Sequence, residues 1–344
     1  MTVATLLIRA DASVAIGTGH VMRCLALAQA WQDAGGRAVF AMAEIPEALL
    51  QRLTFEGFDT ISLPTIPGSS EDAELSLSLA RQVQANWLVI DGDRFARQFL
   101  SRLPSSGLRT LLLDDFAERQ SFPVDVVLNL NFGAIELPYR LTGFQGALLL
   151  GEQYVLLRRE FTSRAGDRAF PETGNRVLVT LGGSDPENLS SKVVVSLAEL
   201  HDLKVTLIAG AGNAHRTYLQ ELAGSNVDVE FNVANMPARM YEADMAVIAA
   251  GGTLWELLYM RCVVLSYARN PAQASVVTTL ANMNILADMG NMRDFNGPAL
   301  ATKVRETAKS ASVRERLANA GRQLIDGKGA HRVVEMMQSL GGRQ

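Results

Sequence analysis

The sequence predicts an α/β protein with two doubly wound parallel sheets, each in a domain of its own. Two observations predict this fold. The chain has 344 residues, more than a single hydrophobic core usually supports, so two domains are expected. Short apolar runs without polar alternation also recur along the chain and are separated by segments of helical length, which is the pattern of buried parallel strands.

Six such runs in the first half predict the strands of one sheet. They are TLLIRA (5–10), AVFAMA (38–43), NWLVID (86–91), TLLLDD (110–115), VDVVLNLN (124–131) and ALLLG (147–151). The pattern stops in 158–175, a charged stretch with Gly, Pro and Ser that has no sustained apolar period and indicates a domain boundary. We therefore expect a first domain over 1–160.

Five more runs predict that the second half repeats this architecture. They are RVLVTLGG (176–183), KVTLIAG (204–210), VDVEFNV (227–233), MAVIAAGG (245–252) and VVLSYA (263–268). We expect a second domain over 174–325 and a C-terminal helix or tail over 326–344. Two such domains that face each other across a cleft would place the carboxyl ends of both sheets, with their ligand-binding loops, on the same gap.

The composition excludes several classes of function. The 32 basic and 36 acidic residues and a pI near 5.7 leave no cationic excess for binding nucleic acid or anionic lipid. A signal sequence and an apolar run of 18 residues are both lacking, so we expect a soluble, cytoplasmic protein without stable membrane insertion. Cys24 and Cys262 have no metal-ligand spacing, and we interpret them as core residues rather than as a disulfide or zinc site.

A glycine-bearing loop, DASVAIGTGHVMR (11–23), joins the first strand to a helix. Gly17 and Gly19 permit a close backbone approach to a ligand and place His20 at the helix N-terminus. That position lowers the pKa of a histidine, which favours the neutral imidazole that a general base needs. An ordinary tight turn with His20 bonded to the backbone explains the residues equally well. The spacing is not the GxGxxG fingerprint, since Met22 stands at the third glycine.

In the second half, the first strand runs into LGGSDPENLS (181–190). Gly182, Gly183 and Ser184 are candidates for a nest of backbone N–H groups that binds a diphosphate. A plain strand-to-helix turn, with Ser184 or Asp185 as N-cap and Pro186 at the first helical position, is the alternative. Both interpretations can hold together, because capping geometry itself exposes the amides.

A second turn of the same form, AAGGTLWELL (249–258), places Gly252 and Thr253 at another helix start. Two such turns in one domain favour a nucleotide diphosphate over other ligands. Glu256 lies one turn into this helix and is a candidate for binding ribose hydroxyls. A solvated helix glutamate explains it nearly as well.

Taken as an ordered set, these segments resemble a known family. The segments are RADASVAIGTGHVMRCLALA, VIDGDRF, DVVLNLN, GEQYVLLRREF, LGGSDPENLS and AAGGTLWELL. In order and spacing, over about residues 5–275, they are similar to the UDP-sugar hydrolases of pseudaminic acid biosynthesis and their spore-coat polysaccharide relatives. The wider group resembles the glycosyltransferase MurG, which implies a GT-B fold of two Rossmann-like domains around a cleft.

The resemblance implies hydrolysis of UDP-2,4-diacetamido-2,4,6-trideoxy-β-L-altropyranose to UDP and the free sugar, by inverting attack of water at the anomeric carbon. His20 matches the catalytic histidine that activates this water. The other matching positions are Asp11, Gly17, Gly19 and Arg23 around the same loop, Gly183, Ser184, Gly252 and Thr253 at the diphosphate, Glu256 at the ribose and Gln273 at the sugar. The resemblance implies a UDP-sugar as partner and neither a metal nor a cofactor.

The chain departs from the family after VID, where an aromatic residue is common and this chain has Gly92, Asp93 and Arg94. We therefore expect a different sugar pocket. Asp93 is a candidate for orienting His20 or binding a sugar amide, although a polar turn at the strand end is slightly favoured. The same alternatives apply to Asp91, Asp114 and Asp115.

Two other functions fit the same scaffold. A glycosyltransferase would use an acceptor hydroxyl in place of water, and a non-catalytic protein would only bind the UDP-sugar. A membrane-bound lipid acceptor would call for a basic, apolar face on the first domain. The helix after Gly19 carries only Arg23 as a basic residue before Gly35, which favours hydrolysis.

Overall fold

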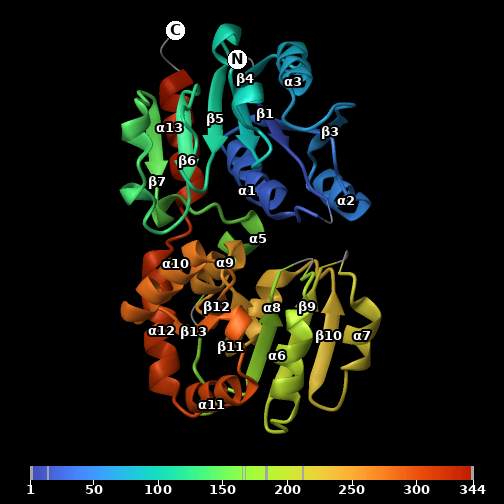
Figure 1. Cartoon of the computed structure of the whole chain (residues 1–344), viewed down its shortest axis with the longest axis vertical. Helices are drawn as coiled ribbons and strands as arrows, with labels where there is room; N and C mark the ends of the chain where they lie inside the picture. Colours follow the sequence, from blue (N-terminus) through green and yellow to red (C-terminus); the bar gives the residue numbers. More distant parts are fainter. Residues whose placement is uncertain are drawn as a thin grey trace. The chain divides into compact units, whose positions relative to one another are not determined.

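The protein, seen in a computed structural model, forms two compact units. The structure describes residues 3–13, 15–164, 166, 168–182, 185–210 and 213–341. The first unit comprises 1–159 together with 327–344, and the second comprises 160–326. Each unit is an α/β domain with one parallel sheet (Figure 1). The predicted fold class is therefore confirmed.

The first unit has a seven-stranded parallel sheet of order β3-β2-β1-β4-β5-β6-β7. Its strands are β1 (Thr5–Ala10), β2 (Arg37–Met42), β3 (Asp59–Ser62), β4 (Ala85–Asp91), β5 (Arg109–Leu113), β6 (Val126–Asn129) and β7 (Ala147–Leu150). Its helices are α1 (Gly19–Asp33), α2 (Glu47–Phe55), α3 (Ser70–Gln82), α4 (Arg97–Leu100) and α13 (Gly329–Gly341), and α5 (Arg159–Thr162) leads into the second unit.

The second unit has a six-stranded parallel sheet of order β10-β9-β8-β11-β12-β13, which repeats the winding of the first. Its strands are β8 (Arg176–Thr180), β9 (Lys204–Ala209), β10 (Val227–Phe231), β11 (Met245–Ala249), β12 (Val263–Ala268) and β13 (Ala287–Asn291). Its helices are α6 (Leu189–Ala198), α7 (Arg216–Glu221), α8 (Met236–Glu242), α9 (Gly252–Tyr259), α10 (Pro271–Asn282), α11 (Gly297–Ala308) and α12 (Ala311–Leu324).

Both faces of the first sheet are buried, which explains why its strands are apolar without alternation. Leu7 of β1 belongs to a core cluster with Leu77 of α3 and Phe99 of α4. Its neighbours Leu6 and Ile8 are also fully buried, and they point to the opposite face because successive side chains of a strand alternate. Helices therefore cover the sheet on both sides, as right-handed crossovers require.

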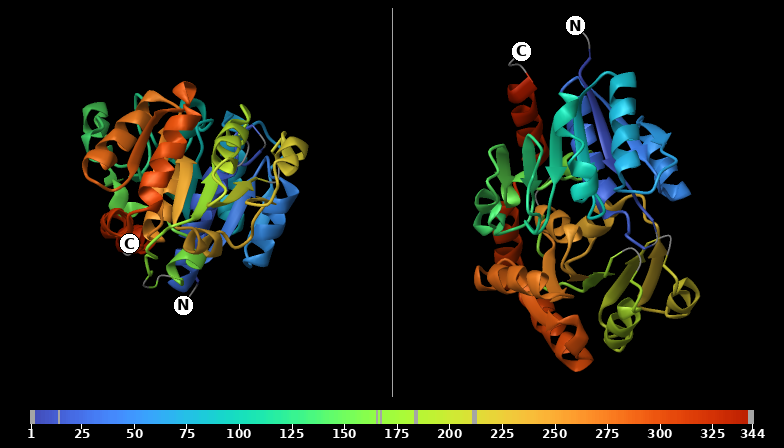
Figure 2. Two further views of the ribbon diagram at one scale, coloured as in Figure 1. Left: turned by 90° about the horizontal axis from the view of Figure 1, so that it is seen from below. Right: turned by 45° about the horizontal axis from the view of Figure 1, so that its top comes forward.

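Helix α13 closes the first unit, although it is the last helix of the chain. It contacts α1, and Figures 1 and 2 show the red helix beside the blue and green elements of this unit. Its face with Val333, Val334 and Met337 is buried. The structure thus assigns 327–344 to the first unit, which the sequence did not predict.

Two strands, β3 and β13, were missed by the sequence reasoning. Each is an edge strand that pairs with a single neighbour, β2 or β12. Their residues are largely half-buried or exposed, so they carry no apolar run. The sequence pattern detects strands with buried apolar residues, and β3 and β13 have no buried residue.

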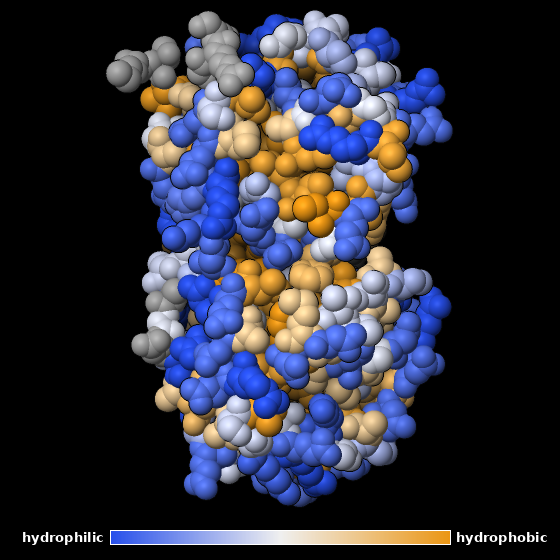
Figure 3. Space-filling view, turned by 90° about the vertical axis from the view of Figure 1, so that its left-hand side faces the viewer, coloured by the Kyte–Doolittle hydropathy of each residue, from blue (hydrophilic) through white to orange (hydrophobic). Residues whose placement is uncertain are grey.

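None of the described helices is long and apolar enough to cross a membrane. Exposed apolar side chains occur nonetheless, with Phe55 and Leu141 both 88% exposed. Figure 3 shows that apolar residues form patches on the face it draws and that hydrophilic residues separate them.

We predict that Gly329→Ala destabilises the first unit by about 1–3 kcal/mol, because a core that is already filled must shift to admit a methyl group. A Cβ at Gly329 would lie 2.2 Å from the carbonyl oxygen of Val155. Urea denaturation followed by tryptophan fluorescence measures this change, with Trp31 and Trp87 in the first unit and Trp255 in the second. Gly224→Ala is the control, since nothing lies within 4 Å of a Cβ there. Equal stability of the two variants would contradict the prediction.

Candidate active site

His20 and Asp91 meet at the point where the winding of the first sheet reverses. His20 lies in the first turn of α1, which follows β1, and Asp91 is the last residue of β4. β1 and β4 are neighbours in the sheet, with β2 and β3 on one side and β5 to β7 on the other. Doubly wound sheets bind ligands outside the carboxyl ends of the strands at this switch point.

The Asp91 carboxylate binds two cationic or polar side chains of α1 at once. Its Oδ1 lies 2.8 Å from Nδ1 of His20. Arg23 donates from Nε to Oδ2 and from Nη2 to Oδ1, each at 2.6 Å. Because Asp91 is fully buried, it needs this compensation, and Arg23 supplies it in the bidentate geometry that carboxylates favour.

A second carboxylate extends the cluster. Arg23 also donates to both oxygens of Asp115, at 2.9 and 3.0 Å. Asn131 donates to Oδ1 of Asp115 at 3.1 Å. Asp115 follows β5 and Asn131 follows β6, so consecutive strands place these groups on one edge of the sheet. With His20 neutral, the two carboxylates and Arg23 carry a net charge of about −1.

This excess negative charge favours protonated His20. Burial lowers the pKa of His20, but the hydrogen bond and the charge of Asp91 outweigh burial, and the pKa is raised above its ordinary value. Burial raises the pKa of Asp91, yet the charge of Arg23 holds it below its usual range. The sequence prediction that the helix N-terminus lowers the pKa of His20 was therefore wrong, because the charge of a nearby carboxylate dominates.

His20 lines a cavity of about 270 Å³. Asp11, Asp91 and Asp93 line it too, with Ala15, Ile16, Gly92, Arg94 and Phe95. With Nδ1 engaged by Asp91, Nε2 of His20 has no hydrogen-bond partner among the described residues. The geometry gives His20 one oriented nitrogen and one free nitrogen, which is what a general base requires.

Asp11 has one oxygen committed to structure and one oxygen without a partner. Its Oδ1 accepts hydrogen bonds from the backbone N–H groups of Ala43 and Glu44 and lies 2.8 Å from Nη1 of Arg9. Its Oδ2 is buried and has no hydrogen-bond partner. In the loop that follows, Gly17 has φ +75°, in the left-handed region that favours glycine. Asp11 therefore offers an acceptor in the cavity that a ligand N–H or O–H could use.

Asp93 does not orient His20; Asp91 does. β4 ends at Asp91, and Gly92 follows with φ +144°, so the chain turns and leaves Asp93 exposed at the cavity rim. The sequence left Asp91 and Asp115 open as strand-end turn residues. The signal in the sequence that favours Asp91 is its place as the last residue of the apolar run 86–91.

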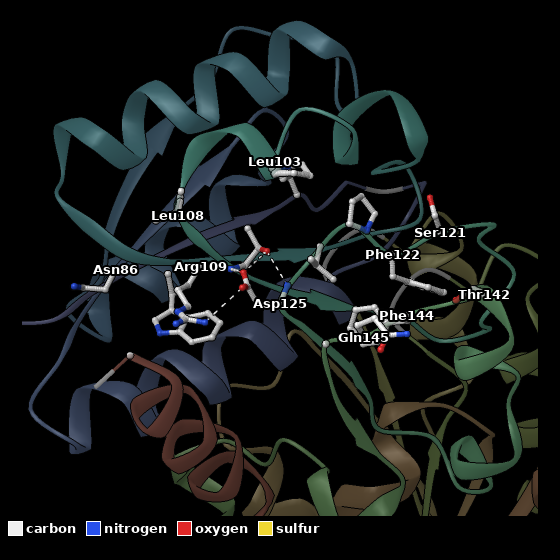
Figure 4. A pocket seen from close by; sticks show the side chains of 18 of the residues that line it. Asn86, Leu103, Leu108, Arg109, Ser121, Phe122, Asp125, Thr142, Phe144 and Gln145 are labelled. Carbon is white, nitrogen blue, oxygen red and sulfur yellow. Dashed lines mark hydrogen bonds and ion pairs between the residues drawn. The ribbon is translucent and has the colours of Figure 1, made fainter. Parts of the chain in front are cut away.

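A larger cavity, of about 850 Å³, lies at the opposite edge of the same sheet, at the amino ends of β4 to β7. Figure 4 shows its lining, with Asp125 at the centre. Asp125 accepts hydrogen bonds from the N–H and hydroxyl groups of Thr110 and forms an ion pair with Arg109 at 3.6 Å. These charged groups already satisfy each other, so we place the chemistry at the smaller cavity.

In the second unit, the turn after β8 also lies at a switch point, between β8 and β11. Gly182 has φ +96°, whereas Gly183 and Ser184 lie outside the described residues. The helix that follows begins at Leu189, later than the predicted start at Pro186. Its N-cap residue is Asn188 rather than Ser184 or Asp185, although the Asp185 carboxylate accepts hydrogen bonds from the N–H groups of Leu189 and Ser190.

The turn after β11 leads directly into α9. Gly252 is the first residue of this helix and Thr253 the second, so the amides of the first turn are at the carboxyl edge of the sheet beside the turn after β8. Glu256 is half-buried one turn further on. The structure thus brings the predicted glycine turns to neighbouring strands.

Gln273 lies in the first turn of α10 and takes part in its cap. Its N–H donates to Oδ1 of Asn270 at 2.9 Å, and its Oε1 accepts from the N–H of Arg269 at 2.9 Å. This reciprocal arrangement is a form of capping box. The cap accounts for Oε1 and leaves the side-chain NH₂ group for a ligand contact, so the predicted contact with the sugar stays a prediction.

No model of a known protein family matches the sequence. The chain is 28% identical over 283 residues to the UDP-2,4-diacetamido-2,4,6-trideoxy-beta-L-altropyranose hydrolase of Campylobacter jejuni, covering 80% of this chain and 95% of that protein. The relationship expected from the motifs is confirmed. The chain is also 24% identical over 339 residues to the spore coat polysaccharide biosynthesis protein SpsG of Bacillus subtilis, covering 96% and 97%.

Solved structures show the same fold. MurG of Acinetobacter baumannii matches with a TM-score of 0.65 and 14% identity, over 98% of this chain and 99% of MurG. The spinosyn rhamnosyltransferase SpnG, complexed with thymidine diphosphate, matches with a TM-score of 0.66 and 14% identity, over 97% and 99%. The predicted GT-B fold is confirmed, and the chain is similar to enzymes that act on nucleotide sugars.

We predict that Asp91→Asn lowers the pKa of His20, because the negative charge that favours the imidazolium is lost while burial and the charge of Arg23 remain. Arg23 keeps its ion pair with Asp115 in this variant, so the loss of stability should stay below the ~3–5 kcal/mol of a buried charge left without a partner. NMR titration of the imidazoles measures the pKa, with His201, His215 and His331 as internal controls. Asp115→Asn is a milder variant with a smaller change in the same direction. An unchanged pKa of His20 in both variants would contradict the electrostatic argument.

Proposed function

We propose that the protein hydrolyses a UDP-linked 2,4-diacetamido-2,4,6-trideoxy sugar, of β-L-altro configuration, to UDP and the free sugar, as a step in the biosynthesis of a nonulosonic acid such as pseudaminic acid. One observation carries the proposal: His20 is held by Asp91 through Nδ1 and has a free Nε2 in a cavity at the switch point. The similarity to a hydrolase of such a UDP-sugar supports the substrate class.

In this reaction, neutral His20 takes a proton from water through Nε2. The water oxygen attacks the anomeric carbon from the face opposite the diphosphate, and the bond from that carbon to the diphosphate oxygen breaks. UDP leaves with the electron pair, and the sugar is released with inverted configuration. Asp91 accepts the Nδ1–H hydrogen bond, which fixes the tautomer and stabilises the imidazolium as it forms.

The leaving group needs stabilisation of its charge more than protonation. Backbone N–H groups at helix starts provide partial positive charge of about half an elementary charge. We assign this role to Gly252 and Thr253 at the start of α9, and we propose that backbone N–H groups of the turn with Gly182, Gly183 and Ser184 also donate to the diphosphate. Donors placed in advance where charge develops lower the barrier most.

The proposal also assigns contacts with the sugar and the ribose. Asp11 Oδ2 and Asp93 are assigned to the N–H or O–H groups of the sugar, since both residues line the His20 cavity. The side-chain NH₂ group of Gln273 is assigned to the sugar and Glu256 to the ribose hydroxyls. Nothing lies within 4 Å of a Cβ at Gly19, so we assign the open space at the start of α1 to the substrate.

The decisive experiment is a panel of UDP-linked diacetamido sugars incubated with purified protein in buffer alone, with UDP and free sugar detected. We expect release of both at equal rates and, by NMR, the inverted anomer as first product. Turnover only on addition of an acceptor would identify a glycosyltransferase. Binding of every sugar without turnover would identify a non-catalytic UDP-sugar binding protein.

We predict that His20→Asn lowers kcat by about 100- to 10,000-fold, the range that a positioned base contributes, and leaves UDP binding unchanged. His201→Asn, in the second unit, is the matched control with wild-type turnover. Wild-type activity should rise with pH through the pKa of His20, above its ordinary value of about 6.5, because only neutral His20 accepts a proton. Asp115→Asn should move this rise in activity to lower pH. Full turnover by His20→Asn would refute the assignment.

We predict that Glu256→Ala weakens UDP binding by about tenfold, the usual loss for one hydrogen bond to a charged group. The ribose assignment also requires that wild-type protein prefers UDP to 2′-deoxy-UDP and that the variant loses this preference. Calorimetry with both nucleotides measures the four affinities. A preference that survives the substitution would remove Glu256 from the ribose contact.

A further inference from the structure

Arg269 reaches from one strand end to the glycine turn of another strand in the second unit. It is the first residue after β12, and β12 is separated from β8 by β11 alone. Its Nη2 donates to the carbonyl oxygen of Leu181, the residue before Gly182. The guanidinium therefore lies at the carboxyl edge of the sheet, against the turn that follows β8.

The contact between Arg269 and this turn depends on glycine. Nη1 of Arg269 lies 3.9 Å from where a Cβ would stand on Gly182, and Gly182 has φ +96°. A larger residue at this position would adopt a strained backbone and place its own side chain beside the guanidinium. The guanidinium thus lies against Leu181 and Gly182.

The charge of Arg269 is only partly compensated inside the protein. Its one ion pair among the described residues is with Asp185, at 3.4 Å. The Asp185 carboxylate already accepts hydrogen bonds from Leu189 and Ser190 at the start of α6. Nε of Arg269 is buried without a hydrogen-bond partner, and Nη1 has none among the described residues.

Two more buried polar atoms lack partners on neighbouring loops of this edge. They are Oδ1 of Asn188, which follows β8, and Nδ2 of Asn213, which follows β9. Asn213 is only 5% exposed. Buried polar groups are nearly always hydrogen-bonded in the functional state of a protein, so several unsatisfied groups on one edge indicate that a polar ligand binds there.

We propose that Arg269 binds the diphosphate of the nucleotide sugar and neutralises the charge of the departing nucleoside diphosphate. The inference rests on the proposed function and adds a residue that the motifs did not indicate. The start of α9 offers a partial charge of about one half, whereas a nucleoside diphosphate carries two or more negative charges. A guanidinium supplies a full charge and several N–H donors in a plane that suits phosphate oxygens.

The test compares Arg269→Gln with Arg305→Gln, which removes the same charge from an exposed position on α11 of the same unit. Calorimetry measures binding of UDP, uridine and inorganic pyrophosphate to each protein. We expect Arg269→Gln to weaken UDP and pyrophosphate by about 10- to 100-fold, as for loss of a charge-assisted contact, and to leave uridine unchanged. Arg305→Gln should bind all three as wild type does.

Arg269→Lys distinguishes the contribution of the positive charge from that of the guanidinium N–H donors. It keeps the positive charge but loses the planar set of donors, so we expect UDP affinity between those of wild type and Arg269→Gln. Thermal melting of both variants shows whether the fold is kept. Equal losses for UDP and uridine would show that Arg269 maintains only the shape of the site and would overturn the proposal, as would unchanged affinity for UDP and pyrophosphate in Arg269→Gln.

The outcomes separate this proposal from the proposed function. If wild-type protein binds UDP and Arg269→Gln binds it equally well, the role of Arg269 alone fails. If wild-type protein binds pyrophosphate but shows no preference for UDP, the nucleotide part of the proposed function fails, and pyrophosphate still tests Arg269. If wild-type protein binds neither probe, both proposals fail.

Discussion

The carboxylate of Asp91, buried at the end of β4 and shared between His20 and Arg23, is the interaction on which the candidate site depends. A carboxylate with no exposed surface is tolerable only with a cation beside it, and Arg23 lies one turn after His20 on the same helix. The pair therefore fixes the start of α1 against the sheet. The hydrogen bond and the charge of Asp91 also raise the pKa of His20. The packing of α1 and the proposed chemistry therefore both depend on the Asp91 carboxylate.

The two units use one topology for different chemical tasks. Both sheets reverse their winding between the first and fourth strands in sequence, β1 and β4 or β8 and β11, and both place functional candidates there. The first unit has a histidine, an arginine and carboxylates at this edge, which suits proton transfer. The second has glycine turns, helix starts and Arg269, which suits an anion. Side chains rather than winding decide what each switch point binds.

The fold is shared with glycosyltransferases such as MurG and SpnG at 14% identity, so the fold cannot select the reaction. Hydrolysis and glycosyl transfer differ only in whether water or an acceptor hydroxyl attacks the anomeric carbon. We therefore propose hydrolysis because of the oriented base in the small cavity and the similarity to a UDP-sugar hydrolase.

The sequence by itself determined the buried strands, the repeated α/β architecture and the place of His20 at a helix start, because apolar runs and glycine turns are local signals. It could not determine that Asp91 rather than Asp93 holds His20, since that depends on the turn at Gly92 and on β1 lying beside β4. Nor could it determine that the pKa of His20 is raised, that β3 and β13 form edge strands, or that α13 packs in the first unit. Each of these depends on contacts between residues far apart in the chain, which only the tertiary structure brings together.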